Sequence, residues 1–99
     1  MGQAITITHS QSESRGRYEA RVEGVAGSGE LTYTRVSPTK IIADHTGVDD
    51  SLRGTGVARA LVDRLVADAR RDGIRIVPQC SYVLAQFRRN PDWSDVMTA

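Results

Sequence analysis

The spacing of apolar residues changes once along this chain, and that change limits the folds it can adopt. In the first half apolar and polar residues alternate, most strictly from Arg17 to Glu23, where Tyr18, Ala20 and Val22 fall on one face. A two-residue period predicts β-strands with one buried and one wet face. From about Gly54 onward apolar residues recur every three or four positions, which predicts an amphipathic helix. The sequence therefore predicts an α+β fold.

Four strands are expected in the first half, at residues 5–8, 17–23, 30–34 and 40–48. The polar stretch from Gln11 to Gly16 is expected to form a loop, and Ser37-Pro38-Thr39 to end the third strand. Because the connections are short, these strands favour an antiparallel meander.

The second half is expected to form a helix, a strand and a helix. The first helix should begin near Gly54 and end at Gly73, with Asp68 among the charged residues on its solvent face. A short strand follows at residues 74–78. A second helix at residues 81–89 should end before Pro91. These patterns leave Trp93 and the residues after it unplaced.

Length and composition narrow the class of protein. The 99 residues fit one domain over residues 1–99, and 39% apolar with 25% charged residues is typical of a globular chain. A net charge of +1 gives no electrostatic case for nucleic acid. The single cysteine, Cys80, excludes an internal disulfide and fits a reducing compartment. No apolar run approaches the ~20 residues of a membrane helix, and no signal peptide is apparent. We therefore expect a cytoplasmic protein that does not bind membranes.

The chemically informative feature is the run Arg53-Gly54-Thr55-Gly56-Val57-Ala58, at the start of the expected helix. Main-chain N–H groups there lack internal partners and the helix dipole is positive, so the turn can hold an anion. Gly54 and Gly56 would let a phosphate approach closely, Ala58 keeps the first turn clear, and Arg53 adds a positive charge. Glycines at such a junction are also common as simple turn residues. The run lacks the third glycine of the dinucleotide fingerprint and the Gly-Lys-Ser/Thr of nucleotide hydrolases.

The run resembles the R-x-x-G-x-A pattern of the GNAT superfamily of N-acetyltransferases. Three further blocks resemble a small single-domain subgroup of that superfamily: His45-Thr46-Gly47-Val48, Pro78-Gln79-Cys80-Ser81-Tyr82-Val83 and Arg88-Arg89-Asn90-Pro91-Asp92-Trp93. The resemblance covers residues 17–97. It implies a GNAT-like core whose sheet splays apart between the fourth and fifth strands. It also implies that main-chain amides of residues 53–58 bind the pyrophosphate of acetyl-CoA.

The activity implied by this resemblance is acetyl-CoA-dependent N-acetylation of an amine, either a small molecule or a protein lysine, without a metal. The alternative is a non-catalytic acyl-CoA-binding regulatory module, which needs neither Cys80 nor His45. Larger GNAT enzymes carry two helices after their first strand, and this chain has no room for them. We therefore expect an acceptor side that is more open, or one that a second copy completes in a homodimer.

Three positions are candidates for the chemistry. The resemblance implies that the main-chain N–H of Val48 contacts the thioester carbonyl. Cys80 could take the acetyl group covalently because thiols are nucleophilic, or it could be a small buried apolar residue. His45 could act as the base, or it could be a structural residue, with Asp44 on the opposite face of its strand. Tyr82 could donate a proton, or it could be a packing residue at the start of its helix. Direct attack by the amine and transfer through Cys80 both stay open.

Overall fold

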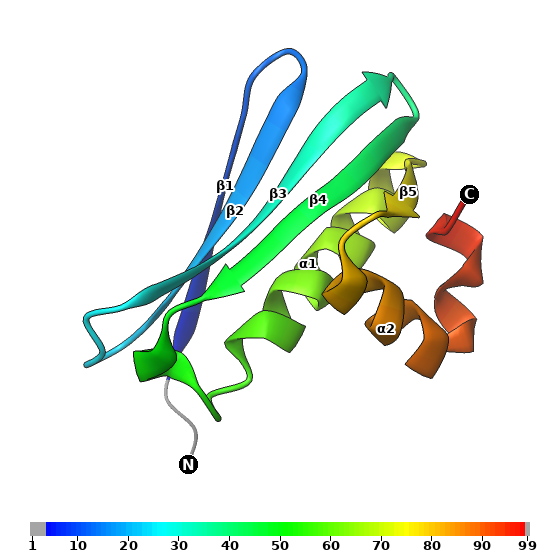
Figure 1. Ribbon diagram of the computed structural model, residues 1–99. Coiled ribbons are helices and arrows are strands. Elements are labelled where there is room, and N and C mark those ends of the chain that lie inside the picture. Colours follow the sequence, from blue (N-terminus) through cyan, green and yellow to red (C-terminus); the bar gives the residue numbers. More distant parts are fainter. Residues whose placement is uncertain (1–3, 99) are drawn as a thin grey trace.

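The computed structural model describes residues 4–98 and shows a five-stranded sheet with helices in the C-terminal half (Figure 1). The α+β fold predicted from the change of period is confirmed. The strands are β1 (Ile5–Gln11), β2 (Arg15–Val22), β3 (Ser28–Ser37), β4 (Lys40–Val48) and β5 (Arg75–Pro78). The helices are the 3-10 helix η1 (Asp50–Leu52), α1 (Val57–Asp72), α2 (Ser81–Arg89) and the 3-10 helix η2 (Pro91–Val96).

The strands follow one another across the sheet in the order β1-β2-β3-β4-β5. The first four are antiparallel, as the short connections predict, and β5 pairs with β4 in parallel. Parallel neighbours need a crossover connection, and here α1 supplies it. The expected sheet, mainly antiparallel with helices in the second half of the chain, is therefore confirmed.

The hairpin of β1 and β2 is longer than the sequence predicts. We expected a loop from Gln11 to Gly16, but β1 runs through Gln11 and β2 begins at Arg15. Gly16 lies within β2 opposite Tyr33, and the Tyr33 ring fills the space that a side chain at Gly16 would occupy. The glycine therefore marks a close approach of a ring to the strand, and the loop prediction there was wrong.

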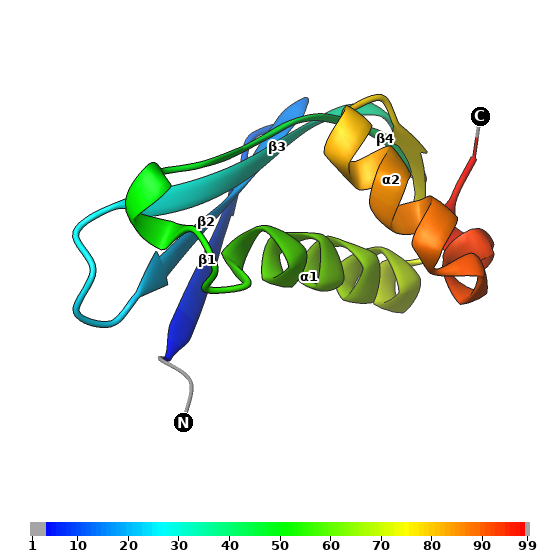
Figure 2. The same cartoon turned by 60° about the horizontal axis from the view of Figure 1, so that its bottom comes forward.

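One face of the sheet is covered by α1 (Figure 2). The helix buries a stripe of apolar side chains at helical spacing, namely Val57, Leu61, Val62, Leu65, Val66 and Ala69. These side chains pack against residues of the sheet that include Tyr18, Leu31 and Tyr33. Burying each such leucine or valine stabilises the fold by about 1.5–3 kcal/mol. Packing on the sheet thus fixes the axis of α1 and the position of its first turn.

Asp68 of α1 is buried, although its spacing predicts the solvent face. It is 6% exposed and accepts a hydrogen bond from the Tyr18 hydroxyl at 2.8 Å. Arg64 and Arg71, one turn to either side, approach the same carboxylate at 3.1 and 3.3 Å. The prediction was wrong because the partner of Asp68 stands far away in the sequence.

The residues after α2 fold back onto the domain. Trp93 and Val96 of η2 are buried in the same core, and the Trp93 ring meets Phe87 of α2 edge to face at 5.7 Å. Met97 then forms an isolated bridge with Ile76 of β5. Within residues 4–98, no helix has the length and apolar character that crossing a membrane requires.

Candidate functional site

β5 pairs along its whole length with the first four residues of β4, and β4 then continues beyond the end of β5. Residues 40–43 of β4 pair with residues 75–78 of β5. The last link is the N–H of Cys80, which donates to the carbonyl of Ala43 at 2.9 Å. From Asp44 to Val48, β4 has no strand partner on this side among the described residues. The expected splay between the fourth and fifth strands is therefore confirmed.

A β-bulge in β4 lies at the point where the two strands separate. Ala43 pairs with Tyr33 whereas His45 pairs with Thr32, so Asp44 is an extra residue without a counterpart in β3. Such a bulge bends its strand and increases the local twist. It therefore turns the second half of β4 away from β5.

The bulge also changes which side chains share a face. The Asp44 carboxylate accepts a hydrogen bond from the Thr34 hydroxyl at 2.7 Å, on the face away from α1. His45, opposite Thr32, lies on that same outer face, with its imidazole next to Gly47. The expectation that Asp44 and His45 point to opposite faces was wrong, because the extra residue shifts the alternation by one.

Where β4 continues past the end of β5, from Asp44 to Val48, a gap opens beside it. The main-chain groups of Thr46 and Val48 face this gap. The N–H of Asp49 donates to the carbonyl of Ser28 at 3.1 Å, so Asp49 directs its main-chain groups toward β3. In an antiparallel ladder this direction alternates from residue to residue. Thr46 and Val48 therefore direct their N–H and C=O groups away from β3. Val48, chosen from the resemblance, lies where its N–H reaches the gap.

The glycine-rich turn leads directly into α1. Gly54 and Gly56 have φ angles of 79° and 82°, a left-handed conformation that favours glycine. The first hydrogen bond of the helix runs from the Ala60 N–H to the Gly56 carbonyl at 3.0 Å. The N–H groups of residues 57–59 thus precede the helical ladder, and a Cβ built at either glycine would meet nothing within 4 Å. The space beside both glycines, just before the helix, is therefore open.

Buried side chains on both sides hold this turn. Leu52 and Val57 are each 1% exposed. Between them, the Thr55 hydroxyl donates to the Leu52 carbonyl. Arg53 extends outward with an 83% exposed side chain and lies 3.4 Å from the carboxylate of Asp50. The backbone of the turn is therefore fixed, while its one cation is accessible to solvent. We had expected the helix to begin near Gly54, but its first residue is Val57.

Arg59 joins the first turn of α1 to the C-terminal elements, a role that its periodicity did not reveal. Its guanidinium bonds Asp63 at 2.9 Å, Gln86 of α2 at 3.4 Å and Asn90 at 3.3 Å. It also lies 5.1 Å from the centre of the Trp93 ring, a cation–π distance. Asp63 is one helical turn from Arg59, but Gln86, Asn90 and Trp93 lie far along the chain, so no local pattern could predict them.

Cys80 lies beside the gap at the start of α2. Its thiol donates to the Thr46 hydroxyl at 3.5 Å. Burial raises the pKa of the Cys80 thiol, but hydrogen bonds from the Thr46 hydroxyl and from main-chain groups of Val83, Tyr82 and Thr46 favour the thiolate more strongly. The net result is a pKa below the ordinary value of a thiol. Sequence reasoning missed Thr46, although it belongs to the block that contains His45.

Cys80 and His45 lie on opposite faces of the sheet. Thr46, the partner of Cys80, is opposite the buried Leu31 and so faces the core, whereas His45 faces outward and is exposed. The structure therefore does not bring these two side chains together. Burial raises the pKa of Tyr82, which keeps its phenol protonated. In the part of the chain that the structure describes, no group of three or more His, Cys, Asp or Glu residues could hold a metal ion.

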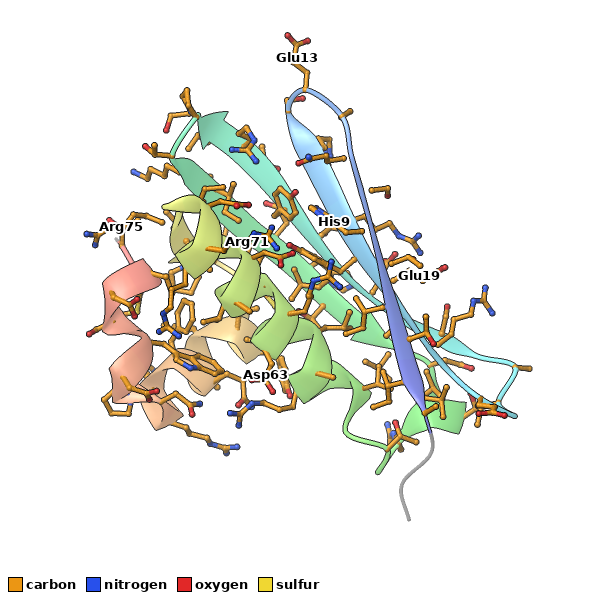
Figure 3. The ribbon with its side chains drawn as sticks, turned by 180° about the vertical axis from the view of Figure 1, so that it is seen from behind. His9, Glu13, Glu19, Asp63, Arg71 and Arg75 are labelled. Carbon is orange, nitrogen blue, oxygen red and sulfur yellow. The ribbon has the colours of Figure 1, made fainter. Side chains whose placement is uncertain are left out.

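A separate cavity of about 140 Å³ lies between the C-terminal half of α1 and strands β1–β3. His9 and Arg71 are two of its lining residues and lie near each other in Figure 3. Its polar groups bond one another: the Tyr18 hydroxyl donates to Asp68, and His9 Nε2 lies 2.7 Å from the Tyr33 hydroxyl. Because these groups already have partners, the gap and the glycine-rich turn are the stronger candidate site.

Comparison with known proteins agrees with this geometry. A model of the GCN5-related N-acetyl-transferase family matches residues 17–96. The chain is also similar to the solution NMR structure of a Staphylococcus aureus protein described as a "GCN5-like putative N-acetyltransferase". The two are 28% identical over 93% of this chain and 88% of that one, with a TM-score of 0.64. No curated protein matches the chain. Because the family model spans most of the sequence, the chain belongs to the GCN5-related N-acetyltransferase family.

Proposed function

We propose that this protein transfers the acetyl group of acetyl-CoA to the nitrogen of an amine. The observation that carries the proposal is the first turn of α1, where the N–H groups of residues 57–59 precede the helical ladder beside two open glycines. Family membership supports acyl transfer in general. The proposal sets the reaction in the cytoplasm, because a lone thiol is compatible with a reducing compartment.

The residues present fit the two polar parts of acetyl-CoA. The N–H groups of residues 57–59 are suited to the pyrophosphate because they combine free donors with the positive end of the helix dipole. Arg53 is exposed at the mouth of the turn and adds a positive charge. In the gap, the main-chain groups of Thr46 and Val48 can pair with the amides of the pantetheine arm as a strand edge would.

We propose that the amine attacks the thioester directly. In this scheme the thioester enters the gap from the core side, and its carbonyl accepts a hydrogen bond from the Val48 N–H. The amine approaches from the outer face, where His45 is exposed and can take its proton. Cys80, on the core side, can give a proton to the departing thiolate. The opposite positions of His45 and Cys80 suit this division of roles.

The rival route forms an acetyl-enzyme. The Cys80 thiolate would attack the thioester carbon, forming a new carbon–sulfur bond and breaking the bond to CoA, which leaves as a thiolate and takes up a proton. The amine would then displace Cys80. Incubation with acetyl-CoA and no amine separates the two routes, because only the covalent route adds one acetyl group to Cys80, which mass spectrometry detects.

Binding is tested by calorimetry with acetyl-CoA on the wild type and on a G56E variant. The variant places bulk and negative charge beside the N–H groups of residues 57–59, and we expect binding to be lost. G24E is the matched control, since Gly24 has a φ of 81° and the same open surroundings but lies in the β2–β3 turn. Equal affinity of G56E and G24E for acetyl-CoA would contradict the proposed site.

Catalysis is tested by measuring CoA release by chromatography with a panel of small amines and lysine peptides. Direct transfer predicts that H45A loses turnover while C80A retains a measurable part of it, both with unchanged affinity for acetyl-CoA. Tight binding without turnover on any amine would instead support the non-catalytic acyl-CoA-binding module. No binding at all would refute both functions.

A further inference from the structure

In the described part of the chain no strand pairs with the outer edge of β1, and the hydrogen-bonding groups of that edge can be identified. In its pairing with β2, the Glu23 N–H donates to the Ala4 carbonyl at 3.1 Å and the Ser12 N–H donates to the Arg15 carbonyl at 2.8 Å. Both β1-side partners are even-numbered, and the register between them is regular. The direction of the main-chain N–H and C=O groups alternates from residue to residue in such a ladder. The groups that point outward, away from β2, are therefore those of the odd-numbered residues Ile5, Ile7, His9 and Gln11.

This edge lacks the features that usually protect a sheet. The strand Ile5–Gln11 reads ITITHSQ and contains no Asp, Glu, Lys, Arg or proline, and its register with β2 contains no bulge. Proteins normally place charges, prolines or bulges on such a strand to prevent pairing. The edge at β5 is covered instead: Met97 bridges Ile76, and the Thr98 N–H donates to the Ile76 carbonyl at 2.9 Å. Among residues 4–98, one edge of the sheet is thus covered and the other is open.

We propose that β1 pairs with β1 of a second copy of this chain, antiparallel about a two-fold axis that passes Thr8. In this register all seven residues of both strands overlap. Ile5 faces Gln11 of the second copy and Ile7 faces its His9. By the two-fold symmetry, Gln11 and His9 of the first copy face Ile5 and Ile7 of the second. The result is four pairs, each exchanging two main-chain hydrogen bonds. Because each chain contributes one such edge, the assembly closes at two copies.

The chemistry of the strand favours a second copy over a charged peptide. In the proposed register Thr8 meets Thr8 and Thr6 meets Ser10 on the outer face, so small hydroxyl side chains pair without bringing like charges together. On the core side the half-buried Ile5 and Ile7 gain cover. Each Glu19 is separated from its counterpart by three strand spacings, about 14 Å, and already lies near Arg17 and Arg21. Repulsion between the two Glu19 carboxylates is therefore screened.

The paired edges would create one continuous sheet with β4 and β5 of each copy at its two far ends. Both gaps lie beyond β2 and β3 from the paired edge, so they stay open. Pairing of the two copies is therefore independent of the proposed acetyl transfer, and either can fail without the other.

The test is analytical ultracentrifugation of the full chain, with T8K and T8E variants. Because such a contact is at the small end of specific interfaces, protein is measured from about 10 μM to about 1 mM. The wild type should approach twice the mass of one chain. T8K alone and T8E alone place like charges opposite each other at the axis, and each should weaken association about fivefold or more. An equimolar mixture of the two should restore association, because the introduced lysine then faces the introduced glutamate.

The control is T39K, which makes the same change at an exposed threonine of the β3–β4 turn and should associate like the wild type. Circular dichroism confirms that each variant is folded. A wild type that is monomeric at the highest concentration would overturn the proposal. So would T8K that associates as well as T39K, or a mixture no better than its components. Unchanged affinity of T8K for acetyl-CoA is expected, since the exposed Thr8 side chain lies on the face of the sheet opposite to α1 and the turn.

Discussion

Replacing Tyr18 with phenylalanine should destabilise the fold through one buried hydrogen bond. The Tyr18 hydroxyl lies 2.8 Å from Asp68, and the two residues are 2% and 6% exposed. The other partners of the carboxylate, Arg64 and Arg71, have side chains 39% and 67% exposed, so water screens their ion pairs. Tyr18 is thus the buried donor to this charge. A hydrogen bond to a charged group contributes about 1.5–3 kcal/mol, which is the loss we expect for Y18F.

Urea unfolding followed by circular dichroism measures this loss. With a slope of about 1.5 kcal/mol per molar urea for a domain of this size, the unfolding midpoint of Y18F should fall by about 1–2 M. Y82F is the matched control, because Tyr82 is partly exposed, and its free energy of unfolding should stay within about 0.5 kcal/mol of wild type. A double-mutant cycle with D68N isolates the pair. A coupling below about 0.5 kcal/mol would refute the assignment of the loss to this bond.

Three further outcomes are expected. Burial, together with the hydrogen bond to Asp68 and its charge, raises the pKa of Tyr18. The folded protein therefore keeps this proton above about pH 10, where unfolded tyrosine loses it. Tyr18 should lower stability there by about 1.4 kcal/mol per pH unit, and Y18F should remove this contribution from the pH dependence of unfolding while those of Tyr33 and Tyr82 stay. The lowered pKa of Cys80 predicts that its alkylation by iodoacetamide reaches half-maximal rate at a lower pH than a free thiol does, and T46V should raise that pH. A Cβ at Gly29 would lie 2.8 Å from Val57, so G29A should cost about 1–3 kcal/mol in urea unfolding, and an unchanged midpoint would contradict the packing of α1 on β3.

Much of the fold could be predicted because the buried face of each strand or helix produces a pattern of apolar residues within that segment of the sequence. A run of apolar residues located β4, and helical spacing located α2, with the bounds that the structure shows. β1 and the start of β2 were misjudged because residues 8–15 are exposed, so their hydrophobic pattern carries no information about the ladder. Asp68 was assigned to the solvent face because helical spacing reflects only the residues of α1. The burial of Asp68 depends instead on its hydrogen bond with Tyr18 in β2.

The candidate site could be predicted as a set of segments but not as an arrangement. The glycines at Gly54 and Gly56 point to a helix start that binds anions, and both have the left-handed backbone that glycine permits. The bulge at Asp44 has no signature of its own, since it depends on the pairing of two strands. The predicted faces of β4 were therefore shifted by one residue. That shift explains why the hydroxyl partner of Cys80, Thr46, was not foreseen.

The contact between Arg59 and Trp93 gives the protein an intrinsic fluorescent reporter. The chain contains a single tryptophan, which is 7% exposed and lies beneath the guanidinium of Arg59 in the first turn of α1. The N–H of Arg59 is one of the donors at that turn, so an anion bound there would disturb the cation above the indole. A change in emission intensity or wavelength can therefore follow ligand binding in real time, without a dye and without a second tryptophan to obscure the signal.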